Sequence, residues 1–216
     1  AGKSTLVKCM SGVHAPDGGT IEVDGKPVQL SSPIDAERLG IETVYQDLAL
    51  APDLDAASNV FLGREIRRFK IIYDQAAMRR QTAKSFADLG VGMVQDLRVP
   101  VASFSGGQRQ SVAIARAAMW ARHVILLDEP TAALGVIQTA KVLDLIRRVR
   151  DRGLAVVFIS HNMPQVLEEV GDQPAEILAL VGELLEEGES AGRVAADDEV
   201  ADPEQRFLLH GAQQLE

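Results

Sequence analysis

Residues 124–159 read VILLDEPTAALGVIQTAKVLDLIRRVRDRGLAVVFI, and this stretch decides the fold class. It begins with a continuous apolar run, Val124–Leu127, and ends with a second one, Ala155–Ile159. Such runs are typical of strands that are buried on both faces of a parallel sheet. Between them, Val136–Arg152 has the apolar spacing of an amphipathic helix, and Gly153 is suited to end it. Strand, helix and strand in this order predict an α/β fold with a parallel sheet.

Three segments nearer the N-terminus fit the same architecture. Ser4–Ser11 has an apolar stripe near helical spacing, and Ile41–Tyr45 is a short run that predicts a strand. Gly19–Leu30 alternates apolar and polar residues around Asp24-Gly25, as β-hairpins do. We therefore expect a β-hairpin in this segment.

The middle of the chain has a different character. Asp53–Gln95 is rich in Ala, Met and Arg and has few strand formers, which predicts a helical subdomain inserted into the α/β core. Ser111–Ala121 predicts one further helix before the first buried strand. The predicted organisation is a core with its hairpin (1–50), a helical subdomain (51–115), the rest of the core (116–165) and a divergent acidic segment (166–216).

The composition restricts the class of protein. Of the 216 residues, 46% are hydrophobic and 25% are charged, which is an ordinary mixture for a soluble globular protein. Aromatic residues make up 4%, too few for a surface on which nucleic-acid bases stack. The single cysteine, Cys9, offers neither an internal disulfide nor a metal cluster. No apolar run approaches the roughly 20 residues that cross a bilayer, so a transmembrane protein is not expected.

The net charge of −9 is unevenly distributed along the chain. Residues 1–161 carry a net charge of +3, and residues 162–216 carry one of −12. An acidic block of this kind is usually a solvated face or a disordered tail. Within it, Glu176–Glu187 predicts an amphipathic helix, and the chain from Gly188 onward is expected to be disordered.

Gly2-Lys3-Ser4, directly before the first predicted helix, is the last part of the phosphate-binding sequence G-x-x-x-x-G-K-[ST]. In such a loop, backbone N–H groups at a helix N-terminus attract phosphate oxygens, the lysine neutralises phosphate charge and the hydroxyl binds Mg²⁺. The motif is short, and an ordinary helix N-cap would explain it equally well.

Asp128-Glu129 directly follows the first buried strand, at the edge where open α/β sheets bind ligands. Asp128 can hold Mg²⁺ through water, and Glu129 can polarise an attacking water molecule. The alternative is a solvated loop after a core strand. A solvated loop becomes improbable if a phosphate-binding loop lies at the same edge of the sheet.

Ser105-Gly-Gly-Gln108 stands directly before the predicted helix 111–121. Two glycines after a serine leave backbone N–H groups accessible at a helix start, which makes a second anion site in the same chain. A plain glycine turn is the alternative. Two further polar residues follow predicted strands, Gln46 after Ile41–Tyr45 and His161 after the second buried run. Taken singly, a loop glutamine and a buried histidine would explain them.

The chain from Ala1 to about Met163 resembles the ATP-binding cassette (ABC) ATPases. The resemblance lies in the order of five motifs along the chain: Gly2-Lys3-Ser4-Thr5, Gln46, Ser105-Gly-Gly-Gln108, Asp128-Glu129 and His161. The resemblance implies an α/β P-loop NTPase with a RecA-like core, a small antiparallel β-subdomain and an inserted helical subdomain. It also implies ATP and Mg²⁺ as ligands, and head-to-tail pairing with a second copy or a second ATPase domain. In such a pair, Ser105-Gly106-Gly107 of one copy faces the ATP that Lys3 of the other copy holds.

The resemblance implies a role for each site residue. The phosphate-binding residues are Gly2, Lys3, Ser4, Thr5, Ser105, Gly106, Gly107 and Gln108. The Mg²⁺ ligands are Ser4, Gln46 and Asp128. In catalysis, Glu129 activates water, Gln46 lies near the metal and the water, and His161 lies near the γ-phosphate.

Four segments resemble one branch of the family, the ATPases of bacterial monosaccharide importers of the ribose and fructose type: Glu42–Leu50, Asn59–Gly63, Thr131–Gly135 and Ile159–Met163. This resemblance implies a peripheral subunit at the cytoplasmic face of the inner membrane, bound to transmembrane permease subunits. It implies indirect cooperation with a periplasmic sugar-binding protein and no nucleic-acid partner. One alternative is a soluble ABC-type ATPase that acts on nucleic acid or ribosomes, and another is an inactive truncated fragment.

The sequence departs from the family pattern at both ends. The strand before the phosphate loop, the first glycine of that loop and the aromatic residue that stacks on adenine would all precede Ala1. The buried side chains of such a strand, at about 1.5–3 kcal/mol each, rival the 5–15 kcal/mol stability of a domain. We therefore expect the chain as given to fold poorly and to bind ATP weakly. Beyond about Val166 the resemblance ends, which suggests a shifted reading frame or a divergent ending.

Overall fold

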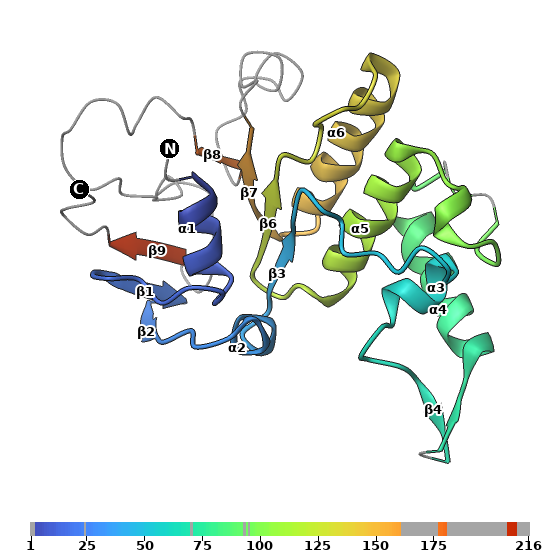
Figure 1. Cartoon of the computed structure of the whole chain (residues 1–216), viewed down its shortest axis with the longest axis horizontal. Coiled ribbons are helices and arrows are strands. Elements are labelled where there is room, and N and C mark those ends of the chain that lie inside the picture. The colour runs from blue at the N-terminus through green and yellow to red at the C-terminus, as the bar shows by residue number, and fades with distance from the viewer. Residues whose placement is uncertain are drawn as a thin grey trace.

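The computed structural model describes residues 3–23, 25–69, 71–92, 94, 96–160, 177–180 and 207–210. A four-stranded sheet with helices on both of its faces forms the centre, and a small antiparallel sheet and a helical region flank it (Figure 1). The strands of the central sheet are β3 (Ile41–Val44), β6 (Val124–Asp128), β7 (Ala155–Ile159) and β8 (Ile177–Leu180). The helices of the described residues are α1 (Lys3–Met10), α2 (Pro33–Arg38), α3 (Ala56–Val60), α4 (Gln75–Asp88), α5 (Gly106–Trp120) and α6 (Val136–Arg150), with a 3₁₀ turn at Val101–Ser103.

The central sheet has the strand order β3–β6–β7–β8, and each neighbouring pair is parallel. Val44 lies opposite Leu127, and Asp128 lies opposite Ile159, so β3, β6 and β7 end at the same edge. The predicted α/β fold with a parallel sheet is therefore confirmed. The predicted boundaries of β7 are correct, and those of β3 and β6 each differ by one residue.

The side chains of β6 alternate between two hydrophobic clusters because successive residues of a strand point to opposite faces. Val124 and Leu126 belong to the cluster that contains residues of α1, α2 and the first hairpin. Ile125 and Leu127 belong to the cluster that contains residues of α3, α4, α5 and α6. Helix α1 and helix α5 therefore cover opposite faces of the same sheet (Figure 1).

The small antiparallel sheet contains the predicted hairpin, with β1 (Thr20–Val23) paired to β2 (Lys26–Val28). Gly25 between them has φ +68°, a backbone conformation that favours glycine. A third strand, β9 (Phe207–His210), pairs antiparallel with β1.

Two expectations for the acidic segment are wrong where the structure describes it. Ile177–Leu180 is strand β8 rather than part of a helix over Glu176–Glu187, and Phe207–His210 is a strand within the stretch expected to be disordered. Both are short apolar runs, and periodicity alone does not distinguish a strand from a helix in so few residues. The rest of that segment lies outside the described residues.

The helical region contains α3 and α4, each capped by an aspartate. Asp55 accepts a hydrogen bond from the backbone N–H of Ser58, and Asp74 accepts one from that of Ala77. Between the two helices stands a hairpin that the sequence reading missed, with β4 (Arg67–Arg68) antiparallel to β5 (Ile72–Tyr73). Two-residue strands are too short to show an alternating pattern, which is why the predicted helical subdomain did not include this hairpin.

None of the helices in the described part of the chain combines the length and the apolar composition that crossing a membrane requires.

Candidate active site

The carboxyl ends of two neighbouring strands, β3 and β6, bring predicted site residues to one edge of the sheet. Gln46 follows β3, and Asp128 and Glu129 stand at the end of β6. Gln46 is exposed, and the two carboxylates are half-buried. Ser160, the residue after β7, is buried at this same edge. His161 comes next in the chain but lies outside the described residues, so its predicted position near a phosphate stays a prediction.

Glu129 is held in a conformation that few non-glycine residues adopt. Its φ is +52°, in the left-handed region, where a side chain costs free energy. Its backbone N–H donates a hydrogen bond to the carbonyl of Ile159 (2.9 Å), and its carbonyl accepts one from Ala132 (3.1 Å). These bonds fix the turn to the neighbouring strand. Backbone strain that the surrounding structure maintains is found preferentially at functional sites, which supports the role predicted for Glu129.

Helix α1 supplies the first predicted anion site. It begins at Lys3, at the edge of the sheet where β6 and β7 end (Figure 1). Its Val7 and Met10 belong to the same hydrophobic cluster as Val124 and Leu126 of β6. Ser4 and Thr5 are exposed in its first turn, where unpaired backbone N–H groups attract anions. The Lys3 side chain and Gly2 lie outside the described residues, so the phosphate loop itself is not described.

Helix α5 begins at Gly106, five residues earlier than the predicted start at Ser111. Ser105 is its N-cap: the Ser105 hydroxyl accepts from the backbone N–H of Gln108 (3.3 Å), and the Gln108 side chain accepts from the N–H of Ser105 (2.8 Å). This reciprocal pair is a capping box. Two glycines have poor helix propensity, which concealed the first turn from the sequence reading. The glycines thus stand in the helix rather than in a turn before it.

The first turn of α5 remains accessible. Ser105 is exposed, Gly106 and Gln108 are half-buried, Gly107 is buried, and a pocket of about 890 Å³ opens beside Ser105 and Gln108 between α5 and α6. The N–H groups of Gly106 and Gly107 occupy the first two helical positions, which have no acceptor within a helix. A Cβ on Gly107 would lie 3.1 Å from the Cβ of Gln138 on α6, so glycine permits the close approach of the two helices.

The oxygen atoms assigned to Mg²⁺ are chemically suited to it. Ser4, Gln46 and Asp128 would offer a hydroxyl, an amide oxygen and a carboxylate, and Mg²⁺ prefers a few such oxygens together with water. The described residues contain no group of three or more His, Cys, Asp or Glu side chains that could form a protein-only metal cage. The donor set therefore fits an ion held jointly by protein, water and phosphate.

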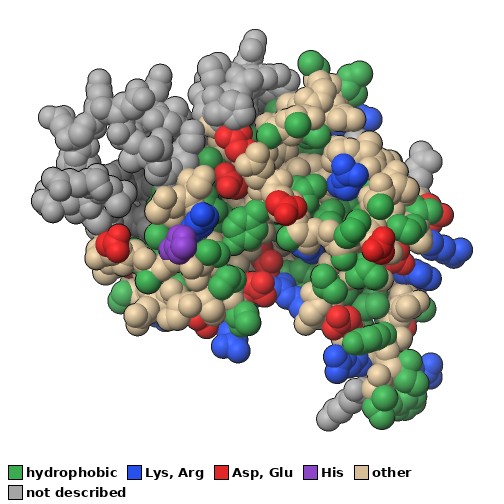
Figure 2. Space-filling view, in the orientation of Figure 1, with side chains coloured by type: hydrophobic (Ala, Val, Ile, Leu, Met, Phe, Trp, Pro, Cys, Tyr) green, Lys and Arg blue, Asp and Glu red, His purple; other side chains and the backbone are tan. Residues whose placement is uncertain are grey.

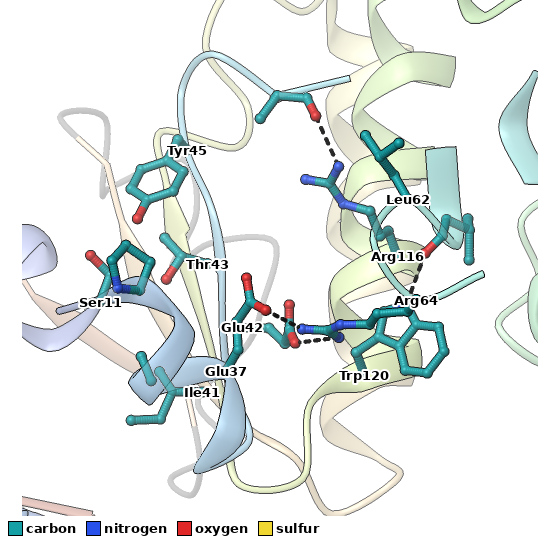
Figure 3. A pocket seen from close by; sticks show the side chains of 14 residues that line it. Ser11, Glu37, Ile41, Glu42, Thr43, Tyr45, Leu62, Arg64, Arg116 and Trp120 are labelled. Carbon is teal, nitrogen blue, oxygen red and sulfur yellow. Dashed lines mark hydrogen bonds and ion pairs between the residues drawn. The ribbon is translucent and has the colours of Figure 1, made fainter. Parts of the chain in front are cut away.

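A second site lies along β3, in a pocket of about 230 Å³ between the sheet and the helical region (Figure 3). At its centre, the Arg64 guanidinium forms ion pairs of 2.7 Å with both Glu37 and Glu42 and lies 5.0 Å from the ring centroid of Trp120. Arg116 donates to the carbonyl of Ala49 (2.9 Å), in the loop that follows Gln46. The pocket thus connects β3, the loop after Gln46 and the helical region.

Burial governs the electrostatics of this pocket. It raises the pKa of Glu42 above 4.5, although the ion pair with Arg64 acts in the opposite direction. Burial also lowers the pKa of Arg116. For Arg64, the hydrogen bonds to Glu37 and Glu42 outweigh burial and raise its pKa. The guanidinium of Arg64 therefore offsets the cost of keeping a carboxylate in a largely buried position.

The sequence reading did not identify this pocket. Glu42 was visible as a charged residue inside a predicted strand, which is unusual for a strand covered on both faces. Its partner Arg64 is 22 positions away, and nothing in the local pattern links the two. Only the packing of the helical region on β3 brings them together.

Comparison with known proteins identifies the family of the chain. Residues 1–132 match the family described as ABC transporter. The chain is 51% identical to the fructose import ATP-binding protein FrcA of Rhizobium meliloti, with 78% of this chain and 67% of that protein covered. It is 48% identical to the xylose/arabinose import ATP-binding protein XylG of Sulfolobus acidocaldarius (78% and 66% covered). It is 41% identical to the ribose import ATP-binding protein RbsA 1 of Rubrobacter xylanophilus (91% and 37% covered). The chain thus spans about two thirds of the first two relatives and about a third of the last.

Two solved structures resemble the fold. One is cbiO1 from Clostridium perfringens, part of the ABC transporter complex cbiONQ, with a TM-score of 0.56, 26% identity, and 72% of this chain and 61% of that chain covered. The other is a nucleotide-free ATP-binding cassette from an ABC transporter, with a TM-score of 0.67 and 21% identity over 78% of this chain and 69% of that one. At this identity the second supports the fold alone.

Proposed function

Since the chain belongs to the ABC transporter family, we propose that it is the ATP-hydrolysing subunit of a carbohydrate importer. The observation that carries this proposal is the edge of the sheet at which Asp128 and Glu129 end β6 beside Gln46, with Glu129 held in the left-handed region. Carboxylates at such an edge, together with an anion-attracting helix start, suit phosphoryl transfer to water.

The residues divide the chemistry between them. The first turn of α1, with Lys3, Ser4 and Thr5, holds the β- and γ-phosphates, because N–H dipoles and a lysine attract them. Mg²⁺, when bound, would neutralise charge on the phosphates, and Ser4, Gln46 and Asp128 would hold it. Glu129 accepts the proton of the attacking water, and its fixed backbone aims the carboxylate. We assign His161 a role near the γ-phosphate.

A second copy, or a second ATPase domain, completes each site. Helix α1 and helix α5 pack on opposite faces of the sheet, so one chain does not direct both helix starts at one nucleotide. In a head-to-tail pair, the exposed Ser105 and the N–H groups of Gly106 and Gly107 face the triphosphate held by the partner. The accessibility of Ser105, Gly106 and Gln108 supports this arrangement.

The permease subunits dock at the pocket along β3. Its Arg116 holds the loop that follows Gln46, and its Arg64 joins that strand to the helical region. Leu62 at its rim is 52% exposed and offers an apolar contact. A displacement of Arg116 by the docked permease would therefore move Ala49 and, through the backbone, Gln46. A periplasmic sugar-binding protein acts on the permease from the other side, and the ATPase stays at the cytoplasmic face.

The substrate class comes from the relatives, whose names give fructose, xylose/arabinose and ribose import. We propose a monosaccharide as the cargo of the whole transporter. No residue of the ATPase need touch the sugar, and no nucleic-acid partner is proposed.

The substitution Glu129→Gln tests the proposal, with Glu22→Gln on β1 as the matched control. Replacing the base should lower phosphate release from ATP at least about 10²-fold and leave ATP binding intact, because the isosteric amide keeps the shape of the site. Glu22→Gln should hydrolyse ATP at the unmodified rate. Undiminished hydrolysis by Glu129→Gln would refute the role of that residue. If calorimetry detects no ATP binding by the unmodified protein, the inactive-fragment alternative holds instead.

A further inference from the structure

The hairpin β4–β5 exposes four large hydrophobic side chains. The exposed fractions are 77% for Phe69, 83% for Ile71, 65% for Ile72 and 53% for Tyr73. Figure 1 shows the hairpin projecting from the helical region, at the opposite end of the molecule from the edge where β6 and β7 finish. Neither the candidate active site nor the pocket along β3 uses these four side chains.

The same hairpin is basic. Residues 67–73 read RRFKIIY, with three basic residues and no acidic one. Arg67 lies over the ring of Tyr73 at 5.4 Å, and Arg68 lies over the ring of Phe69 at 5.3 Å. Figure 2 shows hydrophobic side chains gathered at the end of the hairpin, with Lys or Arg side chains beside them. The neighbouring acidic residue Asp74 is engaged at the base, where it caps α4.

The hairpin is built to present these side chains outward. Its base is closed by a hydrogen bond from the N–H of Asp74 to the carbonyl of Ile66 (2.7 Å), and its end by one from Ile71 to Arg68 (3.3 Å). Phe69 stands in the turn with φ +53°, a conformation that aromatic residues rarely adopt. The turn therefore holds an aromatic ring in solvent where a glycine or asparagine would be relaxed.

We propose that this hairpin rests on an anionic phospholipid surface. Aromatic rings and aliphatic side chains enter the boundary between headgroups and acyl chains, while arginines above the rings reach lipid phosphates. The three basic residues within 67–73, with no acidic residue among them, are complementary to anionic headgroups. The inference rests on the proposed function for one point, that the protein works beside a membrane.

A lipid surface suits the patch better than a protein partner does. Stable protein interfaces bury on the order of 800 Å² on each side over some twenty residues. The end of a hairpin with two residues per strand does not offer such an area. A bilayer needs no matching shape, and a few apolar residues with two or three cations suffice for reversible binding.

Vesicle co-sedimentation of the whole chain tests the proposal. The protein should bind vesicles of phosphatidylglycerol and phosphatidylethanolamine more than those of phosphatidylcholine, and added salt should weaken the binding. Phe69→Ser/Ile71→Ser should lower binding at least about tenfold, and Arg68→Glu at least about fivefold. The matched controls are Ile34→Ser, at a residue 57% exposed on α2, and Arg152→Glu, at an exposed residue after α6; both should bind like the unmodified chain.

A fluorescent label at the hairpin tests the same proposal without relying on a loss of binding, which a misfolded variant would also show. With Cys9→Ser, an environment-sensitive dye on Phe69→Cys should shift to the blue with anionic vesicles, and the same dye on Ile34→Cys should not. Equal binding to both vesicle types, or equal shifts at both positions, overturns the proposal. Binding only to vesicles that contain permease, lost in Phe69→Ser/Ile71→Ser, also overturns it and assigns the hairpin to a protein contact. ATP hydrolysis should persist in all hairpin variants. If the unmodified protein does not hydrolyse ATP, that result counts against the proposed function and leaves the lipid proposal to the vesicle measurements.

Discussion

At the residue scale, two adjacent glycines at the start of α5 have different surroundings. A Cβ on Gly107 would meet the Cβ of Gln138 at 3.1 Å, whereas a Cβ on Gly106 would meet Leu134 at an ordinary 3.5 Å. Gly107→Ala should therefore lower the free energy of unfolding by about 1 kcal/mol, because α5 must move away from α6. Gly106→Ala should be neutral or stabilise by about 0.5 kcal/mol through helix propensity. Denaturant titration of the two variants decides this, and equal stabilities would contradict the packing role given to Gly107.

A single carboxyl group, that of Asp55, also makes the stability of the helical region depend on pH. Asp55 caps α3 and pairs with Arg79 at 3.0 Å, and although burial opposes it, its hydrogen bonds with Ser58 lower its pKa below 3.8. A lowered carboxyl pKa adds stability that is present above pH 3.8 and is lost as the pH falls through the folded value.

Asp55→Asn tests this account. Asparagine keeps the cap but not the charge, so the variant should lose about 0.5–1 kcal/mol at neutral pH. Its deficit should vanish only as the pH falls through the lowered folded pKa of Asp55, below which both proteins carry a neutral side chain. Urea titrations at several pH values measure the difference. A deficit that stays constant with pH would show that the charge of Asp55 contributes nothing.

At the scale of elements, Arg64 joins the helical region to β3. Its side chain is 27% exposed, and that of Glu42 is 12% exposed, so removing the cation leaves a carboxylate in a largely buried place. Arg64→Met should lower the free energy of unfolding by about 1–3 kcal/mol at neutral pH. Because burial raises the pKa of Glu42, the penalty should shrink as the pH falls through that raised value toward 4.5 and Glu42 becomes neutral.

The double variant Arg64→Met/Glu42→Gln supplies the control for that interpretation. If the buried charge causes the loss, the second substitution should recover part of the stability and remove its pH dependence. The matched substitution Arg148→Met breaks an exposed ion pair with Asp144 on α6 and should cost less than about 0.5 kcal/mol. Equal losses for the two arginines would mean that burial of Glu42 is unimportant.

The sequence was most informative about elements whose pattern is local. The buried runs of β6 and β7 and the apolar spacing of α6 correctly predicted the parallel sheet, because burial on both faces leaves its mark in a few consecutive residues. The first turn of α5 was missed because its stability comes from a capping box and from packing on α6 rather than from propensity. The hairpin β4–β5 and the Arg64 ion pairs were missed for a related reason, since both depend on contacts between segments without a periodic signal.

The candidate site followed the same division. Asp128-Glu129 was predicted at the ligand-binding edge because it follows a buried strand, and the family resemblance implied that Gln46 lies near the same metal. The structure has both after neighbouring parallel strands. The left-handed backbone of Glu129 had no sequence signal, because it is imposed by hydrogen bonds to Ile159 and Ala132. The assigned roles of these residues remain predictions that the substitutions above test.

At the scale of the whole molecule, the two faces of the sheet carry separate helix starts, α1 on one and α5 on the other. Composite sites between two copies then predict complementation between variants. Lys3→Ala disables the helix start of α1, and Gly106→Asp places a carboxylate where phosphate would approach α5, with room for its Cβ. Each variant alone should lose ATP hydrolysis at least about 10²-fold, because phosphate loses a cation or meets an anion.

Mixing the two variants in equal amounts should restore about a quarter of the unmodified rate, because half of randomly formed pairs are mixed and each holds one intact site. The control mixture is Lys3→Ala with Glu129→Gln, whose changes fall on the same half of a composite site. It should stay inactive, because every pair then contains either a missing lysine or a missing base in each site. Hydrolysis by this control mixture, or silence of the first mixture at concentrations where the unmodified protein is active, would exclude a nucleotide shared between the first turns of α1 and α5.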